Sequence, residues 1–252
     1  VLESEHSFED VAAKSLACEI LVIEGALSDE FMRGGVSFKE LLLHYATQAK
    51  ALITLGTCAS FGGLFKESSY ADVHGLHFRG EKAHNRYDSL RPKTVTLPGC
   101  PVHPEIIAAT LYALKKGFEM PLDALLRPKA FYAYTIHNGC TRNEYFEYKI
   151  DNHRFGKLEG CLYYDHGCQG PYSGGSCNKI LWNETSSKTR AGVPCFGCTE
   201  PTFPKRNLFS TKKNMGIPQY LPLGVPKRAY LSIAGVTKAF TIDRLEKGLL
   251  DD

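Results

Sequence analysis

Short apolar runs alternate with stretches of helical periodicity in the first half of the chain. The apolar runs cover residues 18–24, 51–55 and 94–97, and a glycine follows each of them within two residues. Residues 38–50 place apolar side chains on one face of a helix, and Pro104 begins a second helix that extends to about residue 116. Because strands that alternate with helices favour a parallel sheet, the pattern predicts an α/β layer.

The pattern changes near residues 125–128. From there to about residue 223 the chain shows little sustained periodicity, while glycine, proline, asparagine and tyrosine become frequent. Such a composition is typical of a segment that is ordered around metals more than around repetitive backbone structure. We therefore predict a parallel-sheet domain over residues 1–126 and a largely irregular, metal-binding domain over residues 127–252, with a helix at 226–248.

Composition and charge limit the classes of function. A content of 43% hydrophobic residues in 252 is enough for a core, and nine cysteines, an odd number, argue against a disulfide framework. The basic residues behind the net charge of +3 are dispersed, so we expect no nucleic-acid partner. No apolar run is long enough to span a membrane and no leader opens the chain, which begins at Val1 without an initiator methionine. We expect a cytoplasmic protein whose true N-terminus is missing.

Two cysteines lie where predicted strands end. Cys58 follows the run at 51–55 and Cys100 follows the run at 94–97, each among glycines or prolines. In parallel α/β layers, ligands gather beyond the carboxyl ends of the strands, and glycine-rich turns allow the backbone to approach a bulky inorganic group. Two thiolates are too few for a four-iron cluster, which normally takes four.

Seven further candidate ligands lie in the second half of the chain. They are His137, Cys140, Cys161, Cys168, Cys177, Cys195 and Cys198. The Cys-x-x-Cys pair at 195–198 also occurs in zinc sites and redox dithiols, but a zinc ribbon would need a second close pair. The seven divide into a set of one histidine and three cysteines, complete for a four-iron cluster, and a set of three cysteines that suits a three-iron cluster. Ser187 or a water is an alternative fourth ligand of the second set.

The remaining chemistry-bearing residues are expected to be structural. Cys18 lies in the first apolar run, so we expect it to be a buried core residue of a strand. His74, His77 and His84 lie in a polar loop, where we expect them to be solvated. His103 beside Cys100 has two open interpretations, a hydrogen bond to a cluster or partner and a helix-capping role.

Six motifs occur in the order found in one known family. They are residues 24–25 (EG), 56–63 (GTCASFGG), 98–104 (PGCPVHP), 137–144 (HNGCTRNE), 160–171 with its GCLY and GCQGP segments, and Cys177 with 194–201 (PCFGCTEP). On these motifs the chain resembles the small, electron-transferring subunit of a nickel–iron hydrogenase. The resemblance implies a flavodoxin-like parallel-sheet domain followed by an iron–sulfur cluster domain.

The resemblance also implies which residues hold each cluster. Cys58 and Cys100 would bind the proximal 4Fe-4S cluster, His137, Cys140, Cys161 and Cys168 the distal 4Fe-4S cluster, and Cys177, Cys195 and Cys198 the medial 3Fe-4S cluster. Electrons from H₂ would pass from the NiFe centre of a large subunit through these clusters to an acceptor protein or quinone. No nickel ligands occur in this chain, and an oligomer of such heterodimers is expected.

Two departures from the family pattern are visible. The N-terminal strand and Cys-x-x-Cys turn, which supply the other two proximal ligands in the family, are absent from this sequence. Either that part of the domain is missing here, or this chain holds a different proximal centre. The spacing between Cys161 and Cys168 is one residue longer than the common version. Residues 141–149 and 181–192 resemble the cytoplasmic uptake and H₂-sensing branches, so any membrane association would be made through partners.

Three other functions compete with an uptake hydrogenase. A quinone-reducing subunit similar to that of complex I would share the first-half fold, but it has no need of the seven ligands after residue 137. An H₂ sensor that signals to a kinase would differ only in its partners. A zinc or interaction module would be colourless and free of iron.

Overall fold

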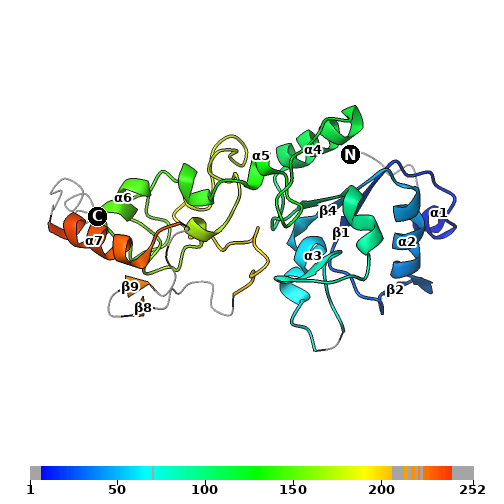
Figure 1. Cartoon of the computed structure of the whole chain (residues 1–252), viewed down its shortest axis with the longest axis horizontal. Helices are drawn as coiled ribbons and strands as arrows, with labels where there is room; N and C mark the ends of the chain where they lie inside the picture. The colour runs from blue at the N-terminus through cyan, green and yellow to red at the C-terminus, as the bar shows by residue number, and fades with distance from the viewer. Residues whose placement is uncertain are drawn as a thin grey trace. The chain divides into compact units, whose positions relative to one another are not determined.

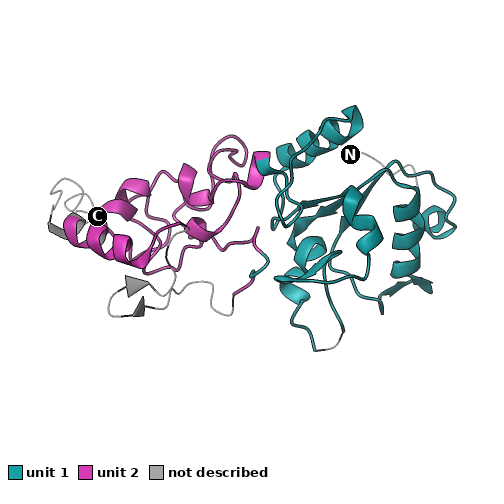
Figure 2. Cartoon of the chain, viewed as in Figure 1, with its two compact units in different colours: residues 1–129, 201–203 teal, residues 130–200, 204–252 magenta. Residues whose placement is uncertain are grey.

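The computed structural model describes residues 7–69, 71–205, 213–214, 217–218, 221 and 224–239. The chain divides into two compact units, which Figure 2 shows in different colours. The first, the α/β unit, comprises residues 1–129 and 201–203, and the second, the cysteine-rich unit, comprises residues 130–200 and 204–252. The boundary predicted from the sequence, between residues 126 and 127, lies three residues before this division. No helix among the described residues is both long and apolar enough to cross a membrane.

A three-stranded parallel sheet forms the centre of the α/β unit (Figure 1). The strands are β1 (Ile20–Glu24), β4 (Ala51–Leu55) and β7 (Thr94–Leu97), in the order β1-β4-β7. Ile20 pairs with Ala51, and Leu52 pairs with Thr94, so the carboxyl ends of all three strands lie at the same edge. The predicted α/β class is therefore confirmed, and two of the three strands have the predicted bounds.

Helices and short ribbons complete this unit. They are α1 (Phe8–Ala12), β2 (Met32–Arg33), β3 (Val36–Ser37), α2 (Phe38–Gln48), α3 (Gly56–Phe61), η1 (Gly63–Phe65), β5 (Phe78–Arg79), β6 (Lys82–Ala83), η2 (Asp88–Lys93) and α4 (Pro104–Lys116). The Ser37 side chain accepts the amide hydrogen of Glu40 at the start of α2, and His103 accepts that of Glu105 at the start of α4. The capping interpretation of His103 is thus confirmed, and a hydrogen bond from it to a cluster or partner stays a prediction.

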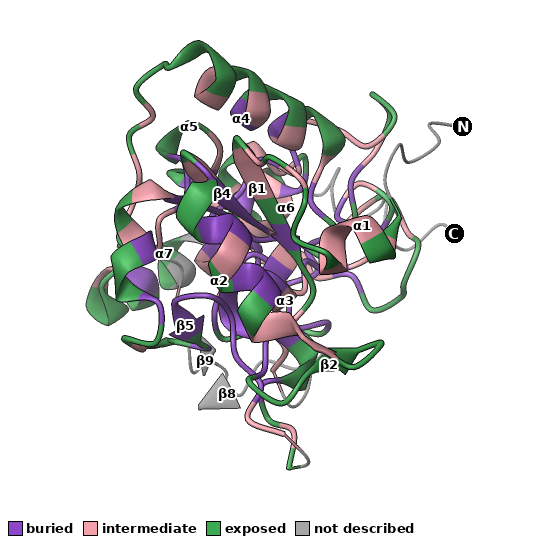
Figure 3. Ribbon diagram, turned by 90° about the vertical axis from the view of Figure 1, so that its right-hand side faces the viewer, coloured by how far each residue is buried: buried purple, intermediate pink, exposed green. Residues whose placement is uncertain are grey.

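The core of the α/β unit is largely aliphatic, with Tyr87 as an aromatic member. Ile23, Leu42, Ala46, Leu52 and Ala59 come from strands β1 and β4 and helices α2 and α3, and all are buried (Figure 3). Cys18 is not among them, and the prediction that it lies in a buried strand is wrong. It precedes β1 by two residues and is half-buried, because the apolar run begins before the strand does.

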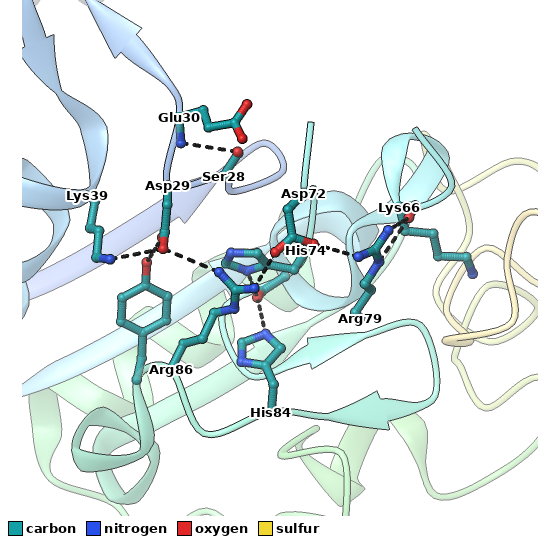
Figure 4. A network of polar contacts seen from close by, with 12 residues as sticks. Ser28, Asp29, Glu30, Lys39, Lys66, Asp72, His74, Arg79, His84 and Arg86 are labelled. Atoms are coloured by element: carbon teal, nitrogen blue, oxygen red, sulfur yellow. Dashed lines mark hydrogen bonds and ion pairs between the residues drawn. The ribbon is translucent and has the colours of Figure 1, made fainter. Parts of the chain in front are cut away.

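The loop between η1 and η2 is held by buried histidines and by ion pairs (Figure 4). His74 and His77 are each 1% exposed, so the prediction that they are solvated is wrong. Other residues of the same loop cover these side chains. The His74 ring packs edge-on against the half-buried His84, with ring centroids 4.9 Å apart. Arg86 bridges Asp29 and Asp72 on the outside of this loop.

The cysteine-rich unit has little repetitive structure. Its elements are η3 (Ile136–Gly139), α6 (Asn143–Tyr148), η4 (Gly170–Tyr172), β8 (Lys213–Asn214), β9 (Ile217–Pro218) and α7 (Lys227–Ala239), preceded by α5 (Lys129–Tyr132) at the division. Most of the described chain between α6 and α7 forms turns and bends, as the sequence predicts. The predicted helix at 226–248 corresponds to α7, and its part beyond residue 239, with Ile242, lies outside the described residues.

Candidate metal centres

The two strand-end cysteines lie on turns that are hydrogen-bonded to each other. Cys58 is in α3, which follows β4 directly, and Cys100 follows β7 by three residues. The Thr57 amide donates to the Gly99 carbonyl at 3.1 Å, and the Gly99 amide donates to the Thr57 hydroxyl at 3.0 Å. Cys58 is half-buried and Cys100 is exposed. Neighbouring parallel strands therefore bring both thiols to the same edge of the sheet.

The Cys58 thiol needs a glycine beside it. A Cβ atom at position 63 would lie 2.5 Å from the Cys58 sulfur, and Gly63 has a φ of 51°. Any other residue would displace the thiol and strain the backbone, so the GG pair of the 56–63 motif has a structural reason. The sequence predicted that these glycines allow the backbone to approach an inorganic group, which stays a prediction, and it did not predict the contact of Gly63 with Cys58 or the helix α3 around it.

In the cysteine-rich unit, His137 and Cys140 lie at the two ends of one 3₁₀ turn. The Cys140 amide donates to the His137 carbonyl at 2.9 Å, and the His137 ring packs edge-on against Phe146 with centroids 4.7 Å apart. Burial, with a contribution from Lys149, lowers the pKa of His137 to about 4. The imidazole is therefore neutral at neutral pH, which is the form that binds metals.

Cys161 and Cys168 are buried and are fixed through their backbones. The Cys161 amide donates to the Ile150 carbonyl at 2.8 Å, and the Cys168 amide donates to the Leu162 carbonyl at 3.2 Å. A Cβ atom at Gly170 would lie 3.5 Å from the Cys168 sulfur and 3.6 Å from the backbone nitrogen of His137. Gly170 thus allows the segment of Cys168 to pass close to that of His137.

Cys140, Cys161 and Cys168 lie close enough for the charge on one to influence the pKa of another. Burial is the largest cause that raises the pKa of Cys161, followed by Cys168, and Cys140 also contributes. Burial likewise raises the pKa of Cys168 to about 11, again with a contribution from Cys140. Three thiols that repel one another as thiolates, in a buried site, favour binding to a cationic centre that would compensate their charge.

The other three cysteines form a second group. Burial raises the pKa of Cys177 to about 11, and Cys198 is the next cause. The pKa of Cys195 is raised well above its usual value by burial and then by Cys168, Cys198 and Cys177. The two groups meet at one hydrogen bond, in which the Cys195 amide donates to the Cys168 sulfur at 3.3 Å.

Aromatic side chains surround the buried thiols. Cys161, Cys168 and Cys195 belong to a cluster with Tyr163, which is 1% exposed, and Tyr164 and Tyr172 pack against it. The Tyr163 and Tyr172 hydroxyls are hydrogen-bonded to each other. These rings exclude water from the sulfurs, which lowers the local dielectric constant and strengthens every charge interaction there.

Ser187, the alternative fourth ligand, is buried and already has a partner. Its hydroxyl donates to the Asn178 side-chain carbonyl at 2.5 Å, next to Cys177. The described residues include no group of three histidine, cysteine or acidic side chains placed for a single metal ion. All nine cysteines are free. A donor set of six buried or half-buried thiols and one neutral imidazole is soft, and such donors suit iron–sulfur clusters.

Sequence reasoning missed two basic side chains near these thiols. Arg142, two residues after Cys140, is 3% exposed, and its amide donates to the Cys140 sulfur at 3.4 Å. Lys205 donates to the Gln169 side chain beside Cys168 and lies over the Tyr172 ring at 5.7 Å. The arginine within the 137–144 motif was the available signal for the first, whereas no sequence pattern indicates the second.

Comparison with known proteins gives matches in both units. Residues 132–210 match the family described as the C-terminal part of the NiFe/NiFeSe hydrogenase small subunit, and residues 2–114 match that of the NADH ubiquinone oxidoreductase 20 kDa subunit. The periplasmic [NiFe] hydrogenase small subunit of Solidesulfovibrio fructosivorans is 33% identical over 192 residues, which are 73% of this chain and 58% of that protein. The uptake hydrogenase small subunit of Azotobacter vinelandii is 32% identical over 90% of this chain and 63% of its own length.

A solved structure has the same fold along the whole chain. The actinobacterial-type NiFe-hydrogenase from Ralstonia eutropha H16 matches with a TM-score of 0.70 and 25% identity, over 100% of this chain and 77% of the other. The present chain spans about 58% of the length of the first curated relatives that it matches. The first-half match is to a family named for an NADH ubiquinone oxidoreductase subunit, but the match at 132–210 covers the segment with all seven candidate ligands of the second half. The chain belongs to the family of nickel–iron hydrogenase small subunits.

Proposed function

We propose that this chain relays electrons through iron–sulfur clusters between the NiFe centre of a large-subunit partner and an electron acceptor. The observation that carries the proposal is the gathering of buried and half-buried cysteines into two adjoining groups, Cys140 with Cys161 and Cys168, and Cys177 with Cys195 and Cys198. Relatives with hydrogenase names support the large-subunit partner and the oxidation of H₂.

We assign the clusters by these groups. His137, Cys140, Cys161 and Cys168 hold the distal 4Fe-4S cluster, Cys177, Cys195 and Cys198 hold the medial 3Fe-4S cluster, and Cys58 and Cys100 supply two ligands of the proximal 4Fe-4S cluster. The clusters supply the chemistry of accepting and releasing single electrons. The close approach of Gly170 to both His137 and Cys168 supports the first set, and the paired turns of Thr57 and Gly99 support the last.

The protein contributes amide donors and a dry environment. The amides of Arg142, Cys195 and Gly197 donate to the sulfurs of Cys140, Cys168 and Cys195 at 3.4, 3.3 and 3.4 Å. Hydrogen bonds to sulfur stabilise the more negative, reduced state and so raise the reduction potential. Burial among tyrosines acts in the opposite direction, because an apolar environment disfavours added negative charge.

The branch and the compartment are inferred from the motifs. Residues 141–149 and 181–192 support assignment to the cytoplasmic uptake or H₂-sensing branches, in an oligomer of heterodimers that reaches a membrane, if at all, through its partners. Cell fractionation tests this: the complex is expected in the cytoplasmic fraction, and recovery in the periplasm would reject it. Rapid H₂-dependent reduction of a dye would favour the uptake enzyme over a sensor.

Electron paramagnetic resonance with iron quantitation on the complex with the large subunit tests the cluster assignment. We expect one 3Fe-4S signal in the oxidised protein and 4Fe-4S signals on reduction. Cys177→Ser should abolish the 3Fe-4S signal and leave the distal cluster, whereas Cys161→Ser should do the reverse. Cys18→Ser, a change of a thiol outside both groups, is the control and should leave both signals. Zinc in place of iron, or loss of the same signal in both ligand variants, would contradict the assignment.

A further inference from the structure

A buried guanidinium, that of Arg142, forms hydrogen bonds with two segments of the cysteine-rich unit that are far apart in the sequence. Arg142 is 3% exposed and follows Cys140 by two residues. Its Nε donates to the Thr189 carbonyl at 2.7 Å, and its Nη1 donates to the carbonyls of Glu159 and Gly160 at 3.0 and 2.7 Å. Its Nη2 donates to the Lys157 carbonyl. All four acceptors are neutral backbone groups.

Within the part of the chain that the structure describes, no acidic side chain forms an ion pair with Arg142. A buried charge without a counter-charge is strongly unfavourable, whereas a buried charge with one can be stable. Four carbonyl dipoles solvate the guanidinium in part, but they carry no net charge. The site is therefore built for an anion that lies close to Arg142.

The groups that can carry that negative charge are sulfurs. The Arg142 amide contacts the Cys140 sulfur at 3.4 Å, and the Gly160 carbonyl that the guanidinium binds directly precedes Cys161. Burial is the largest influence on the pKa of Arg142 and lowers it, while Cys140, Cys161 and Cys168 act to raise it. In turn, Arg142 is one of the groups that lower the pKa of Cys168 against the larger effect of burial.

We propose that Arg142 is a positioning residue whose guanidinium is the counter-charge of the iron–sulfur cluster on His137, Cys140, Cys161 and Cys168, and that it raises the reduction potential of that cluster. This inference rests on the proposed function. Reduction adds one electron, and thus one negative charge, to a cluster that is already anionic through its thiolates. A fixed cation nearby stabilises the reduced state more than the oxidised state.

Arginine is suited to this role for two reasons. Its charge is permanent, so the effect does not vary with pH, and its planar group can reach four carbonyls at once. A lysine at position 142 would keep the charge but has only three donors on one nitrogen. Replacement by lysine therefore separates the charge from the geometry of the loop.

The experiment uses the complex with the large subunit and three variants. Arg142→Met removes the charge, Arg142→Lys keeps it, and Arg154→Met removes a charge from an exposed arginine of the same unit as a matched control. Iron content and the midpoint potential of the histidine-ligated cluster are measured by redox titration with paramagnetic resonance. For Arg142→Met we expect about a tenfold shift of the one-electron equilibrium toward the oxidised form, which is a midpoint about 59 mV lower. Arg142→Lys should shift it less than about threefold, and Arg154→Met should not shift it.

Each other outcome has one meaning. Selective loss of this cluster in Arg142→Met, with retention in Arg142→Lys, also supports the counter-charge. An unchanged midpoint in Arg142→Met, equal shifts in Arg142→Met and Arg154→Met, or loss of the cluster in both variants of Arg142 would overturn it. If the unmodified complex contains no iron–sulfur signal, the proposed function fails; if it does and the Arg142 variants behave as the unmodified protein, only this inference fails.

Discussion

The two units satisfy their buried backbone groups in different ways. In the α/β unit, the ladder of β1, β4 and β7 pairs backbone with backbone. In the cysteine-rich unit, side chains make many of these bonds: Arg142 binds four carbonyls, Asn152 donates to the Glu159 carbonyl at 2.6 Å, and Asn178 donates to the Ile136 carbonyl at 2.8 Å. Irregular chain can be buried only when such polar partners are supplied.

The cores of the two units also differ, since one is built of apolar side chains and the other also contains thiols. The α/β core is built of aliphatic residues such as Leu42, Leu52 and Leu76, which stabilise the fold by burial alone. The other core contains Cys161, Cys168 and Cys195 beside Tyr163. These thiols gain most when a metal centre binds their thiolate forms. We therefore predict that packing alone orders the first unit, whereas the order of the second depends on the clusters that we propose for its sulfurs.

Removal of iron is the strongest test of this difference and should have the largest effect. When a chelator under reducing conditions strips the clusters, residues 130–200 should lose protection against hydrogen exchange by orders of magnitude, because binding free energy is folding free energy in such segments. The strands β4 and β7 should keep theirs. The measurement is hydrogen exchange by mass spectrometry, before and after chelation. Equal loss in both units, or in neither, would remove the distinction.

The stability of the α/β unit should depend on pH through a buried histidine, His77, and not on a metal. The Thr94 hydroxyl donates to the Leu90 carbonyl, so His77 Nε2, 3.0 Å from that hydroxyl, is the donor in their hydrogen bond. His77 Nδ1 then lies buried with no partner among the described residues. Burial, with a contribution from Arg91, lowers the pKa of His77 to about 4. A charged His77 is disfavoured in the folded state.

The sign of the effect follows from this lowered pKa. The unfolded histidine takes up its proton near pH 6.5, so the stabilisation present above that pH is lost as the pH falls toward 4, by up to about 3 kcal/mol. His77→Gln should lose about 1 kcal/mol at pH 7 but show a flatter profile between pH 6.5 and 4. Denaturant unfolding of both proteins over this range gives the difference. Parallel profiles would mean that the pKa of His77 is the same in the folded and unfolded states.

Lys66 provides a third, smaller test within the α/β unit. This lysine is 6% exposed, and its Nζ donates to the carbonyls of Pro201 and Phe203 at 2.7 and 2.9 Å. Lys66→Met keeps the apolar stem but leaves both carbonyls without this donor, so we expect a loss of about 1–3 kcal/mol in the free energy of unfolding. The exposed Lys82→Met is the matched control and should change little. Equal unfolding midpoints of the two variants would contradict the role of Lys66.

The smallest effect is expected on the surface. Arg86 lies between Asp29 and Asp72, and all three side chains are more than a third exposed. Arg86→Gln should therefore cost less than about 1 kcal/mol, and the difference should vanish in about 1 M salt, where charges are screened within about 3 Å. Thermal unfolding at low and high salt measures this. A difference that persists at high salt would indicate a packing role for the arginine.

Much of the α/β unit was predictable because its elements obey local rules. Alternating apolar runs predicted β4 and β7 with their bounds, and Pro104 marked the start of α4. The helix α3 was not predicted, because Gly56 and Thr57 are typical of a loop, and tertiary hydrogen bonds such as those with Gly99 help to hold them in place. His74 and His77 were expected in solvent because a polar loop can fold under itself only when tertiary partners such as Thr94 are present.

In the cysteine-rich unit the candidate ligands could be named from the sequence, and their assignment to clusters stays a prediction, whereas their surroundings could not be predicted. Residue type and spacing indicate Cys195 and Cys198 from the sequence alone. The contact between Cys168 and Cys195 joins residues 27 positions apart, and the bonds of Arg142 reach Thr189 across 47 positions. Contacts of that range follow from the folded path of the chain. No periodicity encodes them.

The path of the chain between the units has a consequence for proteolysis. The backbone leaves the α/β unit after Lys129 and returns to it at Pro201–Phe203. There Lys66 donates hydrogen bonds to the carbonyls of Pro201 and Phe203. A single cut near residues 129–130 would therefore not separate the two fragments, since Pro201–Phe203 of the second fragment would stay bound to the first without a covalent link. Nicked Lys66→Met protein should come apart into two fragments on a sizing column far more readily than nicked protein that retains the lysine.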